Sequence, residues 1–380
     1  MSASSDCPWV ALHYASADES PFVHAATEIR SPAPVIYLRR GGSETVYVTP
    51  YEYLYYRAHG RLTDVRCVDQ LPGYTGRFAD PLIELLRSWD VEVKVPSSFP
   101  AWLFERLGAA GVAVRVDDYE FLSRTLTNGS GDLEAMRAVG EAVAACLAVI
   151  KDDLSRCRIR GDELVLRGEP LDSGVLARRA RVFLAARDIL CEYAFVGCGA
   201  LGFHAHPATT QTLRPHETII VDIAGRSACS GFYADASRTW CRGAPRRHEF
   251  EEHYDAVYAV KRSVEGRIAP GVSVAALHQL TVALLAERGV HVVTDSAELT
   301  GGGGPVLHHS LGHGVGRELH QPPVIAAHAD VPLCEGMVFA FEPGCYVLGA
   351  GGVRLEDTLE VTSDGVASLT NGPDCDWMLA

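Results

Sequence analysis

The feature that most limits how this chain of 380 residues can fold is a β-like segment that ends in one carboxylate and returns with another. The apolar run at residues 217–222, ETIIVD, ends at Asp222, and Asp235 lies on the returning segment after Gly225 and Gly231. A hairpin brings both carboxylates to one face, because side chains alternate between the two faces of a strand. The sequence therefore predicts a hairpin with two acidic groups side by side.

A second stretch repeats this design. The segment 337–342, MVFAFE, ends at Glu342, and Glu356 lies on the returning segment 353–361. Between the two stretches, His313 stands in the glycine-flanked motif SLGHGVG. The repetition predicts a β-rich C-terminal region with an internal twofold, in which all five side chains converge.

Four carboxylates and one imidazole form a hard, oxygen-rich ligand set. Such a set suits Mn²⁺, Co²⁺ or Fe²⁺ better than a structural zinc. A pair of divalent ions activates a water molecule and holds the atoms on both sides of the bond that breaks. Taken singly, each residue has an ordinary explanation. An aspartate near a turn is usually a cap, a glutamate on a strand is usually solvated, and a histidine in a glycine-flanked loop is usually only tolerated there. The five together predict a metallohydrolase.

Length and charge limit the other possibilities. A chain of 380 residues is expected to form two domains. A net charge of −14 disfavours nucleic acid and membrane surfaces as partners, since both require clustered cations, so peptides or small molecules are expected. The first twenty residues lack the pattern of a secretory signal, and the eleven cysteines form no CxxC pair. These features predict a cytoplasmic protein with free thiols.

The N-terminal third has a different pattern. Short β-like runs alternate with helical stretches from about residue 34 to residue 124, which is typical of a small α/β domain. The polar, glycine-containing segment 125–132 is then predicted to be a linker, and Asp132 is predicted to cap the helix that follows. We expect an N-terminal domain at 1–127 and a catalytic domain at 128–380.

The five residues, in the order Asp, Asp, His, Glu, Glu, lie in the motifs VDIAG, GFYADASRT, SLGHGVG, FAFEPG and GVRLED. This arrangement resembles the metallopeptidases with the pita-bread fold, which include methionine aminopeptidase, Xaa-Pro aminopeptidase, prolidase and the metal-free creatinase. The resemblance covers most of residues 130–380 and is strong from residue 213 onward. It implies an α+β chain in which a small creatinase-like α/β domain precedes a pita-bread catalytic domain, as in the Xaa-Pro aminopeptidase and prolidase branch.

The same resemblance implies a role for each residue. Asp222 would chelate the first ion, Asp235 and Glu356 would bridge both ions, and His313 and Glu342 would complete the second. Glu342 would also be the general base. The implied cofactors are two divalent ions, manganese first, with cobalt, iron or zinc as alternatives. A homodimer is also implied, in which the N-terminal domain borders the active-site mouth of the partner.

Further side chains match substrate-binding or catalytic positions of the family. His320, seven residues after His313, would act on the scissile carbonyl, and His309, four residues before His313, would lie at the specificity pocket. Arg354, two residues before Glu356, would support the site.

One catalytic histidine has two candidates. The family places it about seventeen residues before the first metal-binding aspartate; His204 lies eighteen and His206 sixteen residues before Asp222. We favour His206, because the polar segment PATTQTL follows it, with His204 as the alternative.

Departures from the family pattern leave the substrate open. The Asp222–Asp235 hairpin is two residues longer than expected, Ser237 replaces a threonine, Gln321 an acidic residue and Cys345 an aliphatic one. The main hypothesis is cleavage of the peptide bond before proline. The alternative is action on a small non-peptide metabolite, as in creatinase, ectoine hydrolase or dimethylsulfoniopropionate lyase. A binding protein on an inactive fold is disfavoured, because it has no need for four converging acidic groups.

Overall fold

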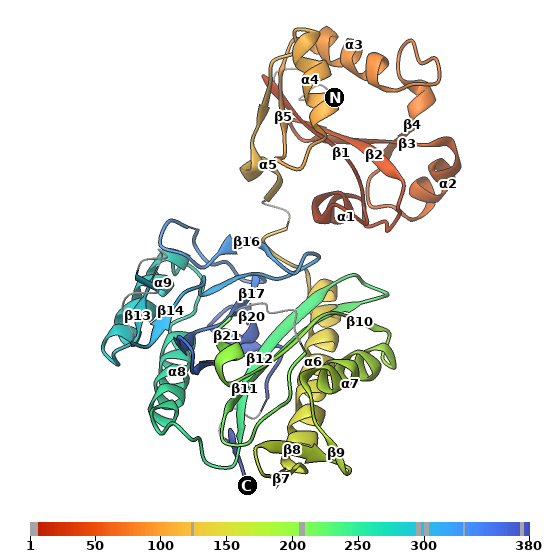
Figure 1. Ribbon diagram of the computed structural model, residues 1–380. Helices are drawn as coiled ribbons and strands as arrows, with labels where there is room; N and C mark the ends of the chain where they lie inside the picture. The colour runs from red at the N-terminus through yellow and green to blue at the C-terminus, as the bar shows by residue number, and fades with distance from the viewer. Residues whose placement is uncertain are drawn as a thin grey trace. The chain divides into compact units, whose positions relative to one another are not determined.

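The computed structural model of the chain describes residues 7–122, 125–204, 210–293, 298–299, 304–329, 331–372 and 376–380. The chain divides into two compact units, Met1–Thr125 and Leu126–Ala380 (Figure 1). The sequence places the boundary near residue 127, in the segment rich in glycine and serine. Each unit has its own sheets and helices.

The first unit is built on a six-stranded sheet with the order β4-β3-β2-β1-β5-β6. β2 is antiparallel to both β1 and β3, and the other three pairs, β3–β4, β1–β5 and β5–β6, are parallel. Both faces of the sheet are buried: Ile36 and Leu38 of β2 join one apolar cluster, and Val35 and Tyr37 join another. The strands are β1 (Trp9–Ser16), β2 (Pro34–Arg40), β3 (Ser43–Val48), β4 (Asp64–Cys67), β5 (Glu92–Val95) and β6 (Val114–Val116). The helices are α1 (Pro21–Thr27), α2 (Pro50–His59), η1 (Val68–Gln70), α3 (Ala79–Trp89), α4 (Ala101–Ala109) and α5 (Asp118–Leu122).

The second unit begins with a long helix, α6 (Ser130–Ser155), whose N-cap is Gly129. The predicted cap, Asp132, is therefore wrong: it lies in the first helical turn, where a carboxylate still stabilises the positive end of the helix. α7 (Ser173–Ala185) is capped by Asp172, whose Oδ1 accepts a hydrogen bond of 2.8 Å from the Val175 amide. The other helices are η2 (Gly199–Phe203), α8 (Glu249–Glu265) and α9 (Val274–Ala286).

Within the part of the second unit that the structure describes, the strands form four small sheets. Their orders are β10-β11-β12-β22, β16-β15-β17-β20-β21, β13-β14-β18-β19 and β7-β8-β9. The strands are β7 (Arg158–Arg160), β8 (Glu163–Leu166), β9 (Glu169–Pro170), β10 (Ile189–Cys198), β11 (Thr218–Ser227), β12 (Tyr233–Arg242), β13 (His291–Val292), β14 (Val306–Leu307), β15 (Gly312–Gly314), β16 (Gln321–Val324), β17 (Val338–Phe341), β18 (Gly344–Val347), β19 (Gly351–Arg354), β20 (Asp357–Val361), β21 (Val366–Ser368) and β22 (Met378–Leu379). α6 packs against β11 and β12, and together with α7, α8 and α9 these strands contribute to one large apolar core.

Two details differ from the sequence-based expectation. β11 does not end at Asp222 but continues to Ser227. The segment expected to return as one strand after Glu342 is divided into β19 and β20, with Glu356 between them. β17 still pairs with β20 in antiparallel fashion, and the β18–β19 hairpin is inserted between them.

A short bridge joins the β11–β12 hairpin to the segment that carries Glu356. The Ser237 amide donates to the Glu356 carbonyl at 3.4 Å, and the Glu356 amide donates to the Ser237 carbonyl at 3.0 Å. The bridge brings together two parts of the chain that are far apart in sequence. Within the described part of the chain, no helix is both long and apolar enough to cross a membrane.

Candidate metal centre

The β11–β12 hairpin places two aspartates on one face. Asp222 pairs with Ser237, and Asp235 pairs with Ala224, two residues further along β11. Residues two apart in a strand share a face, and so do directly paired residues on neighbouring strands. Asp222 and Asp235 are therefore diagonal neighbours, and both are buried, with 7% and 5% of their surface exposed.

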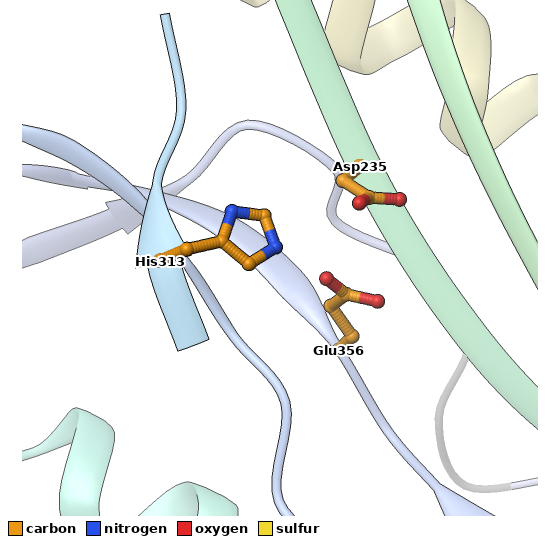
Figure 2. A group of neighbouring side chains, drawn as sticks. All are labelled: Asp235, His313 and Glu356. Atoms are coloured by element: carbon orange, nitrogen blue, oxygen red, sulfur yellow. The ribbon is translucent and has the colours of Figure 1, made fainter. Parts of the chain in front are cut away.

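His313 and Glu356 approach this face from other strands. His313 lies on β15, opposite Ala340 of β17, and Glu356 is held by its bridge to β12. The ligand atoms of Asp235, His313 and Glu356 lie within 4.8 Å of one another, and Figure 2 shows the imidazole facing the two carboxylates. Gly312 allows this approach: it has φ +150°, and a Cβ there would lie 1.9 Å from the Ala340 carbonyl oxygen.

The His313 ring has one nitrogen available for a metal. Its Nδ1 lies 3.3 Å from the Gly314 carbonyl oxygen, which can only accept, so this nitrogen carries the proton. The lone pair on Nε2 is then free to bind a cation. Burial, and secondarily the neighbouring His320, lowers the pKa of His313 to about 4, so the ring is neutral.

Glu342 and Asp222 extend the group of three. Glu342 follows β17, and its Oε1 lies 4.0 Å from Nε2 of His313. Asp222 accepts a hydrogen bond through Oδ2 from Arg354, which is also buried. The structure thus brings the five predicted ligands into one buried neighbourhood.

The carboxylates of this group are difficult to ionise together. Burial, followed by the charge of neighbouring carboxylates such as Asp222, raises the pKa of Asp235 and of Glu356 well above the usual range. Burial raises the pKa of Glu342 to about 8, although Arg354 opposes the shift. Among the described residues, the buried Oδ1 atoms of Asp222 and Asp235 have no hydrogen-bond partner. Buried carboxylate oxygens without a hydrogen-bond donor are suited to bind divalent cations.

Tyr346 is part of the site, although no sequence pattern predicted it. Arg354 donates to its hydroxyl oxygen at 3.3 Å, and that hydroxyl lies 2.8 Å from Nε2 of His309. The His309 Nδ1 faces the Ser310 carbonyl oxygen at 2.6 Å and so carries the proton, which leaves Nε2 to accept from Tyr346. Burial raises the pKa of Tyr346 to about 12, so the hydroxyl stays protonated.

A buried ion network behind the ligands was also not predicted. Arg238 donates to Asp357 Oδ1 at 2.8 Å, and Lys261 donates to the other oxygen of the same carboxylate. Arg238 also donates to the backbone carbonyl of Glu356. Although burial raises the pKa of Asp357, Arg238 and Lys261 lower it more, and the net direction is down. The network fixes the backbone that carries Glu356.

The structure describes three of the four further histidines that were predicted to act at the site. The His320 ring packs edge-on against His313, with 4.2 Å between the centroids. His309 lies next to Glu342, with 3.6 Å between Nδ1 and Oε2. His204 is exposed and contacts the Phe203 ring, and His206 lies outside the described residues.

Comparison with known proteins gives three kinds of likeness. The family model of metallopeptidase family M24 matches residues 133–363. The probable dipeptidase PepE of Mycobacterium bovis is 29% identical over 243 residues, which cover 64% of this chain and 58% of the relative. The Xaa-Pro dipeptidase of Pyrococcus horikoshii is 31% identical over 163 residues, 43% of this chain and 42% of the relative. The matched part thus spans less than two thirds of either relative.

The fold is similar over a longer range. The crystal structure of the prolidase from Pyrococcus horikoshii aligns with a TM-score of 0.75 at 20% identity, covering 96% of this chain and 94% of that one. This likeness confirms the predicted α+β architecture, with a pita-bread region following an N-terminal α/β region.

Proposed function

The chain belongs to metallopeptidase family M24, and from this premise we propose that it is a dinuclear metal-dependent peptidase that cleaves the bond before proline. The observation that carries the proposal is the convergence of the ligand atoms of Asp235, His313 and Glu356 within 4.8 Å. Among the described residues, Oδ1 of Asp235 and Oδ1 of Asp222 on the same hairpin have no hydrogen-bond partner. Relatives named dipeptidase and Xaa-Pro dipeptidase support the substrate class.

Each ligand candidate has a distinct part in this proposal. Asp222 would hold one ion, His313 and Glu342 the other, and Asp235 and Glu356 would bridge them. Manganese is the first choice, because oxygen ligands predominate. When bound, two divalent ions supply a water of lowered pKa and polarise the scissile carbonyl. Arg354 keeps Asp222 oriented through their hydrogen bond and offsets part of the negative charge.

Proton transfer is assigned to side chains of this chain. Glu342 would accept the proton of the attacking water, because its Oε1 lies 4.0 Å from Nε2 of His313, within the ligand group. His320, packed on His313, would donate to the scissile carbonyl. His309 is held by Tyr346 and lies beside Glu342, where it would contact the substrate. His206 is the favoured further donor, with His204 as the alternative.

The test combines metal analysis with a substrate screen. Full-length protein reconstituted with Mn²⁺ should bind close to two ions per chain and hydrolyse Xaa-Pro dipeptides or Xaa-Pro-Yaa tripeptides. A preference for dipeptides would indicate a dipeptidase, and a preference for tripeptides an aminopeptidase. Two bound ions with turnover only of a small non-peptide metabolite would replace the peptidase proposal with the alternative. Absence of metal after reconstitution would contradict both the dinuclear site and its chemistry.

We also propose that the chain acts as a homodimer, with residues 1–127 serving assembly and residues 128–380 catalysis. Helix α2 of the first unit exposes Tyr51, Leu54 and Tyr55, with 76%, 75% and 53% of their surface accessible. These residues are spaced along one helix face, which suits a contact with a second copy. Light scattering should give the mass of a dimer, and Leu54→Glu should shift it toward the monomer. An unchanged dimer in this variant would exclude α2 from the interface.

A further inference from the structure

A cavity of about 710 Å³ lies at the end of α6, against the small β7-β8-β9 sheet. None of the metal-ligand candidates lines it. Four of its nine lining residues are arginines, in a chain whose net charge is −14. The lining residues are Asp153, Arg156, Arg158, Ile159, Arg160, Val165, Leu166, Arg167 and Gly168.

The local fold explains why these arginines gather. Arg158 and Arg160 lie two residues apart on β7, so they share one face of the strand. Arg158 pairs with Val165 of β8, which places Val165 on this face as well. The hairpin turns at Gly161, which has φ +63°, a conformation that suits glycine. A positively charged face around an apolar residue results.

The acidic side chains nearby neutralise little of this charge. Asp153, the acidic member of the lining, is already bound through Oδ2 to Arg179 Nε at 3.2 Å. Asp162 at the hairpin tip lies 2.6 Å from Arg246 and 3.9 Å from Arg214, which are both outside the lining. The carboxylates are thus largely engaged by other arginines.

The arginines of the lining differ in their engagement. Arg156 pairs with Asp152 at 3.0 Å, and Arg160 lies 3.9 Å from Glu163, in both cases at an exposed surface where ion pairs stabilise little. Over the described ranges of the chain, neither Arg158 nor Arg167 has an ion pair or a side-chain hydrogen bond. Two guanidinium groups are therefore available to a ligand.

We propose that this cavity binds a small molecule that carries two or more phosphate or carboxylate groups. Guanidinium groups bind both kinds of anion through paired hydrogen bonds. The volume falls in the range of small-molecule sites, roughly 300–1,000 Å³. Ile159 and Leu166, which belong to the other face of the hairpin, also line the cavity and provide apolar surface for the body of the ligand. The inference does not depend on the peptidase activity proposed above.

The test is titration of the full-length chain with pyrophosphate and, separately, with citrate at constant ionic strength, followed by calorimetry. Both anions also chelate divalent ions, so the metal-free chain is the sample. The variant carries Arg158→Gln and Arg167→Gln, and both positions are exposed, so folding should be unaffected. The control is Arg178→Gln, an exposed arginine of α7 outside the lining.

Saturable binding that weakens about tenfold or more in the double variant, and not in the control, is the expected result. A preference for pyrophosphate would identify a phosphate ligand, and a preference for citrate a carboxylate ligand. Binding that persists in the double variant would place the anions elsewhere and overturn the proposal. Failure of both anions to bind the unaltered chain at millimolar concentration would overturn it as well.

Discussion

The two units treat buried polar groups in opposite ways. In the first unit, the buried polar residues among those described are all serine, threonine or histidine, as with His13 and Ser20, whose side chains hydrogen-bond to each other at 2.9 Å. In the second unit, buried Asp, Glu, Arg and Lys residues gather around the candidate site. Buried charges are costly unless paired or bound to a metal. Among the described residues, the buried polar groups of the first unit therefore carry no fixed charge, whereas the buried charges of the second unit are arranged as a cation site would require.

The largest expected effect concerns the ligands of the second unit. Glu356→Gln should abolish peptide hydrolysis and lower metal content, because a bridging carboxylate becomes a neutral amide. Stability of the metal-free chain should fall little or rise, since repulsion with Asp235 and Asp222 is relieved. Elemental analysis, turnover and thermal unfolding measure these three quantities. Glu335→Gln, at an exposed position, is the control. Normal turnover with two ions bound in Glu356→Gln would show that the buried carboxylates of the second unit are not there to bind metal.

A smaller effect is expected at the two histidines. His206→Ala should lower turnover about 10²-fold, as for the loss of one preorganised donor, while two metal ions remain bound. His204→Ala should be mild, in agreement with the exposed position of this residue. Steady-state kinetics with metal analysis decides between them. The reverse ranking would assign the role to His204, and two small effects would argue against a family-type mechanism.

Metal removal should give the second unit a characteristic pH dependence. The pKa of Glu342 in the folded protein is about 8, above its usual value, so its contribution to stability is complete below about pH 4.5 and is lost as the pH rises through 8. The free energy of unfolding of the metal-free chain should therefore decrease over this range, and saturating Mn²⁺ should reduce the decrease. Denaturant unfolding with and without metal measures it. If the free energy of unfolding depends on pH equally with and without Mn²⁺, the raised pKa of Glu342 is contradicted.

The smallest effect is expected in the first unit and has the opposite sign. Burial lowers the pKa of His13 to about 4, so its contribution to stability is present above about pH 6.5 and is lost as the pH falls through 4. His13→Gln should make hydrogen exchange of peptides in the first unit less sensitive to acid. His59→Gln, at an exposed position in the same unit, is the control. If His13→Gln and His59→Gln change hydrogen exchange alike, the buried imidazole of His13 is not the cause of the acid sensitivity of the first unit.

The sequence predicted local relations well. Asp222 and Asp235 were expected on one face because alternation along a hairpin depends only on residue spacing, and the pairing of β11 with β12 agrees. The prediction of Asp132 as the cap failed because the helix begins three residues earlier than expected, at Ser130, with Gly129 as its cap. Boundaries of this kind depend on the whole first turn and not on one favourable residue.

Long-range partners could not be predicted in the same way. Lys261 and Asp357 are 96 residues apart, and Arg238 and Asp357 are 119 apart. Only the tertiary fold brings them together, and neither a strand nor a helix period relates such positions. Tyr346 escaped attention for another reason: its role depends on the hydrogen bonds to His309 and Arg354, which a count of residues does not reveal.

The bridge between Ser237 and Glu356 has a consequence for the order of folding and metal binding. It closes a loop of more than a hundred residues, and contacts of such long sequence separation form late, because the chain entropy of the intervening segment must first be lost. The pair Asp235 and Glu356 is therefore incomplete until most of the second unit has collapsed. We therefore expect that a metal ion does not nucleate this fold. We expect refolding rates of the second unit to be independent of Mn²⁺ concentration, with metal capture as a separate, later phase.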